Sequence, residues 1–462
     1  MAPFLDPLPD MKKLLRNAQF LAIIAGALAA ATARTALNAH LPRGEKIVEI
    51  AAPGKNPEVC VVPKHFADAT YSSDDTAAEA KLCAIDENTN AAVCPKTNST
   101  NPGLDLHSVP PGFTPAQVAA ANCGTQGAKK IAKYKLSTSC SYTPSILGYY
   151  HLSRMLGGIG DVPPAVIRTF ELQNHVALGR KALAETSSSS LIHQTWASLM
   201  TQLTAGAGAS RRDLLLTDDF KQSYGALSVN PKKEQFYREF FNGGANPVAK
   251  ATNFRDKNPI TALLARNGDI NTLVGRSFTA ANVQTMVQLQ DAADMIVIDT
   301  LMNQQDRFGN VHYLEVYYYQ DPRNLNADGS KKVKLSKMPP ADTVLVAGAV
   351  QVKKMLLKDN DCGVVKQNVA KQANLADHIA HISPNTYERL LKLDAVADSA
   401  DTRDFFTKEL LFTAADYASV LVNLHALAAK LHQACSQGRL RPDLDLDAHF
   451  SGRPSTAPNC DL

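Results

Sequence analysis

The chain has 462 residues and a formal net charge of +4 at pH 7. A charge this small gives no reason to expect a nucleic-acid partner, because proteins that bind nucleic acid usually present a clustered basic surface. The length is too great for one small core, so we expect two lobes or domains.

The first 33 residues have the layout of a cleavable signal peptide. A basic stretch at residues 11–16 precedes an apolar run at residues 20–28, and small residues follow up to an Ala-Thr-Ala sequence at residues 31–33. The apolar run is shorter than the ~20 residues that a transmembrane helix needs. We therefore expect residues 1–33 to be cleaved, with Met11 as an alternative start. The mature protein should be secreted or periplasmic, without stable insertion in a membrane.

The eight cysteines of the chain predict disulfide bonds. An even number of cysteines behind an export signal favours pairing, and the lack of any Cys-x-x-Cys sequence argues against a zinc or thioredoxin-type site. The sequence does not give the pairs, although Cys435 with Cys460 is the first that we expect. Cys362 is a candidate for a free thiol, because it lies inside a candidate active-site motif.

Two regions follow the signal peptide. Residues 34–122 are rich in Ala, Asn, Pro, Thr and Asp and lack clear periodicity, which predicts an irregular, cysteine-containing N-terminal segment. Residues 123–180 predict a small strand-rich lobe. In this lobe Gly124 and Gly127 precede an expected strand at residues 129–136, and a helix begins at Thr143.

Residues 181–436 predict a larger, mainly helical lobe, and residues 437–462 a C-terminal tail. The periodicity indicates a long amphipathic helix at residues 279–302 and a further helical stretch at residues 402–435. Between them we expect a strand at residues 311–319, a basic loop at residues 324–337, and an apolar strand or strand pair at residues 344–357. The fold class is therefore α+β, with a strand-rich part followed by a helical part.

Three motifs carry residues suited to phosphoryl transfer. They are Asp299 with Asp306-Arg307 at the end of the long helix, Asp359-Asn360-Asp361 after a later strand, and His151 to Gly157 with Val162-Pro163-Pro164 near the N-terminal lobe helix. Phosphoryl transfer needs a carboxylate that orients the attacking hydroxyl and oxygen ligands that hold magnesium on the phosphates. The two acidic motifs, in this order, supply both.

In these motifs the chain resembles the secretory-pathway kinases typified by the Golgi casein kinase and its xylose-phosphorylating relative. The catalytic loop of that family reads Asp, six residues, then Asp-Arg-His; Asp299 and Asp306 keep the spacing, and Phe308 replaces the His. The Asp-Asn-Gly metal motif of the family corresponds to residues 359–361, and its His-Leu-Asp-Arg-x-Leu-Gly and Val-Pro-Pro sequences correspond to residues 151–157 and 162–164. We interpret the chain as a divergent bacterial member.

The resemblance implies a two-lobed protein-kinase-like fold, ATP as cofactor with Mg or Mn, and a protein or glycan substrate. It implies a role for each matching position: Asp306 as catalytic base, Asp359 as metal ligand with Asn310 and Asp361 as further candidates, and Lys133 or Lys135 as the phosphate-binding lysine behind Gly124 and Gly127. Lys129 and Lys130 stay open as alternatives for the lysine.

One position departs from the family. Its N-terminal lobe helix carries a Glu that pairs with the phosphate-binding lysine, and the equivalent residue here is Ser145 or Ile146. Glu171, or an acid from the N-terminal segment, is a candidate replacement. The departure keeps open a catalytically silent pseudokinase that binds a nucleotide or a partner, and AMP transfer on the same fold is a third hypothesis.

Overall fold

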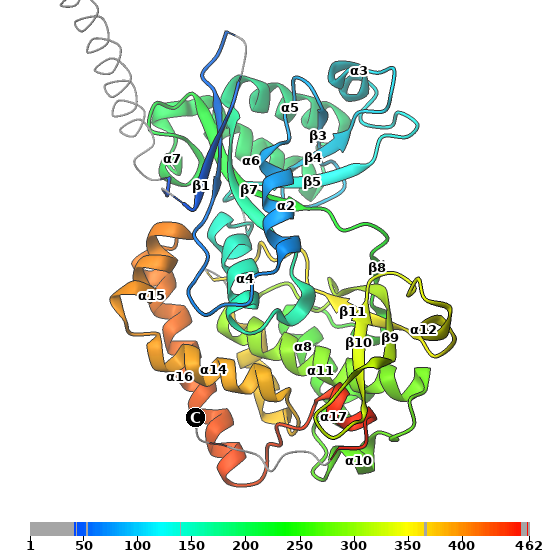
Figure 1. Ribbon diagram of the computed structural model, residues 1–462. Coiled ribbons are helices and arrows are strands. Elements are labelled where there is room, and N and C mark those ends of the chain that lie inside the picture. The colour runs from blue at the N-terminus through cyan, green and yellow to red at the C-terminus, as the bar shows by residue number, and fades with distance from the viewer. Residues whose placement is uncertain are drawn as a thin grey trace, which may run out of the picture.

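A computed structural model describes residues 41–42, 44–51, 54–138, 140–364, 367–453 and 460 (Figure 1). The expected signal peptide, residues 1–33, lies outside these described residues. The fold is α+β, as predicted: an antiparallel sheet dominates the N-terminal part, and helices dominate the C-terminal part. Within the described ranges, no helix has the length and apolar character needed to cross a membrane.

The N-terminal lobe is built on an antiparallel sheet that has seven strands in the described residues, in the order β1-β2-β6-β7-β5-β4-β3. The strands are β1 (Lys46–Ile50), β2 (Glu58–Val62), β3 (Ala91–Pro95), β4 (Leu104–Ser108), β5 (Lys130–Lys135), β6 (Ala165–Glu171) and β7 (Gln222–Val229). The helices of this lobe are α2 (Ser73–Cys83), α3 (Pro115–Ala120), α5 (Leu172–Glu185), α6 (Leu191–Ala205) and α7 (Arg212–Leu215).

Alternation along the strands gives the sheet two different faces. Val166 and Leu227 join the core beneath α5 and α6, whereas their neighbours Ile167 and Ala226 join the core that includes α4 (Thr143–Met155). Because successive side chains of a strand point to opposite faces, this pattern fixes which residues look toward the rest of the molecule. Figure 1 shows α4 lying between the sheet and the helical part.

The C-terminal lobe surrounds α11 (Ala280–Leu301), whose residues 291–301 are all buried. The other helices are α8 (Pro247–Lys257), α9 (Pro259–Leu264), α10 (Ile270–Leu273), α12 (Thr343–Ala347), α13 (Val369–Gln372), α14 (Pro384–Val396), α15 (Ala400–Asp404), α16 (Ala414–Ser436) and α17 (Leu446–Phe450). A second antiparallel sheet contains β8 (Gln235–Phe236), β9 (His312–Leu325), β10 (Lys331–Ser336) and β11 (Val350–Leu356). The segment with Asp306 lies between α11 and β9, and the motif at residues 359–361 follows β11.

Some elements differ from the sequence expectations. The described part of residues 34–122 is not irregular, because it supplies β1 to β4 and two helices. Its strands are only five residues long, and β3, which is buried throughout, lacks the polar–apolar alternation that reveals a strand. β7 joins the N-terminal sheet, which therefore extends beyond residue 180. Residues 324–337 include β10, and residues 344–357 begin in α12 before β11.

All eight cysteines are paired in the described residues, in four disulfides. The expected bond between Cys435 and Cys460 is confirmed. The expectation of a free thiol at Cys362 is wrong, because this residue pairs with Cys140 across 222 residues of chain. Since Cys140 precedes α4 and Cys362 follows the Asp359 motif, this bond ties the two lobes together beside the candidate site.

Candidate functional site

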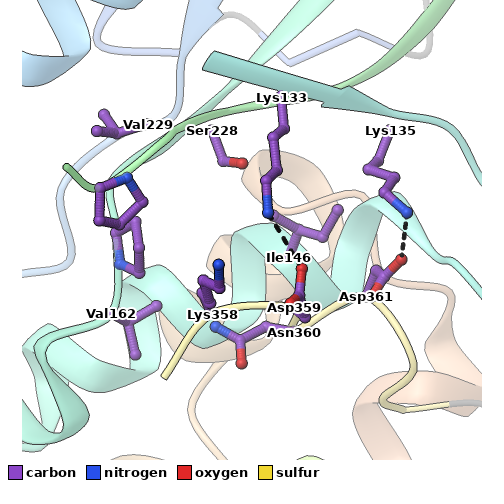
Figure 2. Close-up of a pocket in the computed structure, with 12 residues that line it drawn as sticks. Lys133, Lys135, Ile146, Val162, Ser228, Val229, Lys358, Asp359, Asn360 and Asp361 are labelled. Carbon is purple, nitrogen blue, oxygen red and sulfur yellow. Dashed lines mark hydrogen bonds and ion pairs between the residues drawn. The ribbon is translucent and has the colours of Figure 1, made fainter. Parts of the chain in front are cut away.

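A pocket lies between the N-terminal sheet and the loop that follows β11 (Figure 2). β5 forms its upper wall, Ile146 of α4 lies at its back, and the end of β7 together with the connections after α4 and β7 completes it. The residues that line it are Lys133, Lys135, Ile146, Val162, Pro163, Ser228, Val229, Pro231, Lys358, Asp359, Asn360 and Asp361. The pocket thus combines the predicted lysines with the predicted metal motif.

Two ion pairs cross this pocket. The Nζ atom of Lys133 lies 3.4 Å from Oδ1 of Asp359, and the Nζ atom of Lys135 lies 3.2 Å from Oδ2 of Asp361 (Figure 2). Both lysines point the same way because they stand two residues apart on β5, while Tyr134 between them is buried under α5 and α6. The structure therefore brings together residues that are more than 200 positions apart in the sequence.

The lysines keep the Asp359 carboxylate charged. Burial by itself would raise the pKa of Asp359, but the charges of Lys133 and Lys96 outweigh it and hold the pKa well below its usual range. Its backbone has φ of 56°, in the left-handed region that Asp tolerates better than most residues. The side chain is 29% exposed, so the charged oxygen atoms are accessible from the pocket.

Arg307 connects the two acidic motifs. It is completely buried, and its Nε and Nη2 atoms donate to Oδ2 and Oδ1 of Asp299 at 2.8 and 3.1 Å. Its Nη1 donates to the carbonyl of Lys358 at 3.0 Å, and Nη2 donates to Oδ1 of Asn360 at 2.6 Å. The guanidinium therefore fixes the loop after β11 against the end of α11. The hydroxyl of Tyr149 also donates a hydrogen bond to Asp299.

Asp306 and Asn310 are hydrogen bonded to each other in the segment between α11 and β9. The Nδ2 atom of Asn310 donates to Oδ2 of Asp306 at 3.0 Å and to its carbonyl oxygen at 2.9 Å. Partial burial raises the pKa of Asp306, and the charge of Asp361 adds to the rise, while Lys250 opposes it. Neither Asp306 nor Asn310 lines the pocket, and the amide of Asn310 is hydrogen bonded to the predicted base.

The helix position that carries a Glu in the resembled family has no acid here. The hydroxyl of Ser145 donates to the carbonyl of Asn360 at 2.6 Å and accepts from the N–H of Gly363 at 3.1 Å, so it supports the loop rather than a lysine. Glu171 is the last residue of β6 and the N-cap residue of α5, and it does not line the pocket. An acid of the N-terminal segment lies nearer: Asp105 is the cross-strand partner of Lys133.

Gly124 and Gly127, the expected phosphate-binding glycines, lie in the turn between α3 and β5 and do not line the pocket. The loop that approaches the acidic motif is instead the β3–β4 connection, residues 96–103. In it, the carbonyl of Asn101 accepts from Nζ of Lys135 at 3.1 Å. The amide of Asn101 donates to Oδ2 of Asp361 at 3.4 Å. The Pro-Gly pair that ends this loop was the available sequence signal for a turn.

The residues present fit a magnesium or manganese ion that is shared with a ligand. Among the described residues, no group of three or more His, Cys, Asp or Glu side chains is arranged to hold a metal on its own. Magnesium usually binds through one or two carboxylates together with phosphate oxygens, so a complete protein cage is not required. Asp359 and Asp361 offer hard carboxylate oxygens at the pocket.

Comparison with known proteins gives distant similarity. No family model matches the chain, and no curated protein matches it. The crystal structure of the Golgi casein kinase with Mn/ADP bound has a TM-score of 0.43 and 12% identity over 78% of this chain and 76% of that chain. Another structure of the Golgi casein kinase has a TM-score of 0.40 and 10% identity over 78% of this chain and 75% of that chain. The structure of hydra Fam20 with sugar has a TM-score of 0.39 and 12% identity over 81% of this chain and 95% of that chain. Similarity of this size does not establish the chemistry of this chain.

Proposed function

We propose that the protein is an exported, ATP- and metal-dependent kinase that transfers a phosphoryl group to a hydroxyl of a protein or a glycan. The observation that supports this most strongly is the pair of ion contacts that joins β5 to the loop after β11, Lys133 with Asp359 and Lys135 with Asp361. This arrangement combines cations for phosphate oxygens with carboxylates for a metal. The four disulfides favour an oxidising compartment.

In this proposal each side chain has a role that its surroundings support. Lys133 and Lys135 bind phosphate oxygens from the N-terminal sheet. Asp306 accepts the proton of the attacking hydroxyl; its raised pKa makes it a stronger base than an ordinary carboxylate, and the Asn310 amide orients it. Arg307 fixes the position of the loop that carries Asp359 relative to Asp306.

Asp359 would hold the metal, with Asp361 as a second candidate ligand. A Mg or Mn ion held there would neutralise charge on the phosphates. Asp359 suits this role because its depressed pKa keeps it ionised at neutral pH and because its side chain is accessible. Asn310 would act through Asp306, since its amide is hydrogen bonded to that carboxylate.

The second candidate function is a pseudokinase that binds a nucleotide or a partner without transferring phosphate. The observation that favours it is α4, where Ser145 is engaged with the Asn360 carbonyl and apolar Ile146 faces the pocket. A Lys–Glu pair is one of the parts that protein kinases need in place for catalysis. The two candidates share the pocket and differ in turnover.

Calorimetric titration with ATP, with and without MnCl₂ or MgCl₂, tests the site. We expect metal-dependent binding by the wild-type protein and a loss of at least about tenfold in affinity for Asp359→Asn, whose ion pair and metal ligand are both weakened. Asp404→Asn, which alters an exposed ion pair with Lys408, is the matched control and should bind normally. ATP binding that ignores both the metal and Asp359 would contradict the proposal of a metal site.

A turnover measurement separates the two candidate functions. Asp306→Asn should keep metal-dependent ATP binding, because Asp306 does not line the pocket, and should lose most release or transfer of the γ-phosphate. If the wild-type protein binds ATP with metal but hydrolyses or transfers the γ-phosphate no faster than Asp306→Asn does, the protein is a pseudokinase.

A further inference from the structure

Lys96 and Lys135 lie in one row across the N-terminal sheet, with Gly103 between them. The β3–β4 ladder continues one residue beyond β3, because the N–H of Lys96 donates to the carbonyl of Gly103 at 2.9 Å. On the other side of β4, Leu104 pairs with Tyr134, which places Gly103 opposite Lys135. Directly opposite residues share a face of the sheet, so Lys96 projects from the same face as Lys135.

Gly103 provides the space in which the Lys135 side chain lies. A Cβ atom at residue 103 would stand 3.0 Å from Cδ and 3.3 Å from Cε of Lys135, and 2.9 Å from the carbonyl oxygen of Tyr134. These separations are shorter than carbon atoms normally allow, so a larger residue would displace the lysine. The glycine therefore lets two lysines approach each other above the strand that separates them.

The backbone of Lys96 is held from two directions. Its N–H takes part in the ladder with Gly103, and its carbonyl accepts a hydrogen bond of 3.0 Å from Nε1 of Trp196. Trp196 is completely buried in α6, which makes it a rigid support. The Lys96 side chain thus starts from a fixed point on the sheet.

The neighbouring lysines form ion pairs, whereas Lys96 forms none in the described residues and meets the charge of Asp359 only at longer range. Lys133 pairs with Asp359, Lys135 with Asp361, and Lys358 with Glu234, whereas the Lys96 ammonium has no ion-pair partner in the part of the chain that the structure describes. Burial lowers the pKa of Lys96 to about 8, and the positive charges of Lys135 and Lys133 contribute to the decrease. A half-buried ammonium without a partner is unfavourable until an anion joins it.

We propose that Lys96 is a third phosphate-binding lysine, which joins Lys133 and Lys135 in binding the phosphate chain of a nucleoside triphosphate. The inference rests on the proposed nucleotide site and specifies how that site holds its ligand. The β3–β4 connection, whose Asn101 contacts Lys135 and Asp361, then also contributes a cation, and phosphate binding no longer depends on β5 alone. In such an arrangement three lysines bind the phosphates, although α4 carries no glutamate to position a lysine.

The test compares Lys96→Met with Lys221→Met by calorimetric titration with ATP and MnCl₂ and, separately, with adenosine. Lys221 is an exposed lysine directly before β7, at the end of the strand away from the pocket residues Ser228 and Val229, so its replacement makes the same change of charge at a distance from the pocket. We expect Lys96→Met to weaken ATP binding at least about tenfold and to leave adenosine binding unchanged, because a charge-assisted contact to phosphate is lost. Lys221→Met should match the wild type, and Lys96→Arg should restore much of the affinity.

The possible outcomes separate this inference from the proposed function. If the wild-type protein binds ATP with metal and Lys96→Met binds it within twofold, Lys96 is not a phosphate ligand, although the nucleotide site stands. An equal loss for adenosine and ATP would also overturn the inference, because it would indicate a general structural effect. If the wild-type protein does not bind ATP, the proposed function and this inference fail together. Should Lys96→Met not fold, Lys96→Gln gives the same comparison with a polar side chain.

Discussion

Replacing Arg307 by methionine should weaken the junction between α11 and the loop after β11 more than any exposed arginine replacement. The change removes four hydrogen bonds and leaves the Asp299 carboxylate buried without its cation. Breaking a buried ion pair by removing one partner costs about 3–5 kcal/mol. For a chain of this size, such a loss corresponds to a fall in Tm of roughly 3–5 °C.

Differential scanning calorimetry at pH 7 measures this effect, with Arg323→Met as the matched control. Arg323 also contacts two carboxylates, Asp321 and Asp342, but its side chain is 63% exposed, so we expect a change within about 0.5 kcal/mol. The Arg307→Met variant should also bind ATP more weakly, because the loop with Asp359 loses its anchor. A Tm within 2 °C of the wild type would refute the view that Arg307 holds the two acidic motifs together.

Three further predictions concern stability and the pocket. Burial raises the pKa of Asp294 to about 7, so between about pH 4 and pH 7 the folded state keeps a proton that the unfolded state has lost, and stability falls as pH rises. The Tm advantage of Asp294→Asn over the wild type should therefore be larger at pH 8 than at pH 5; an advantage that does not change with pH would contradict this. Replacing both Cys140 and Cys362 by serine should lower unfolding stability by about 2–5 kcal/mol in denaturant titrations, because the bond closes a long loop between the lobes; an unchanged midpoint would argue against this. Gly103→Ala should displace Lys135 and weaken ATP binding, whereas Gly208→Ala should not, because its added Cβ meets nothing within 4 Å and its φ lies outside the left-handed region; equal affinities for both variants would show that the space at Gly103 is unimportant.

The parts of the site that were predicted from sequence have strong local signals. Lys133 stands on a short strand between a glycine turn and a proline-initiated helix, and Asp306 follows the long, largely buried helix α11. Asp359 follows β11, a strand that was expected within residues 344–357. For such residues the order of elements along the chain is enough to place them, and the structure brings Lys133 and Asp359 into contact.

The parts that were missed depend on contacts between distant segments. β7 enters the sheet between β6 and β5 although three helices separate it from β6 in the sequence, and no local pattern specifies that insertion. Lys96 and Asn101 lie in a polar stretch that reads as a simple turn. Their relevance appears only when the β3–β4 connection meets a loop 260 residues later, as the contact between Asn101 and Asp361 shows. Cross-strand position, which the sequence does not reveal, likewise places Asp105 opposite Lys133.

The two pocket carboxylates are held to different degrees, and the difference favours Asp359 as the metal ligand. Asp361 is 8% exposed and pairs with Lys135, whose side chain is equally buried, so this contact is part of the packed structure. Asp359 is 29% exposed and pairs with Lys133, whose ammonium a phosphate group would take over. Because that exchange would free the Asp359 carboxylate as a phosphate arrives, every charge would keep a partner while metal and nucleotide bind together. We propose that Asp359, by pairing with Lys133, takes the place of a helix glutamate before the nucleotide binds, so that the serine at position 145 would not prevent activity.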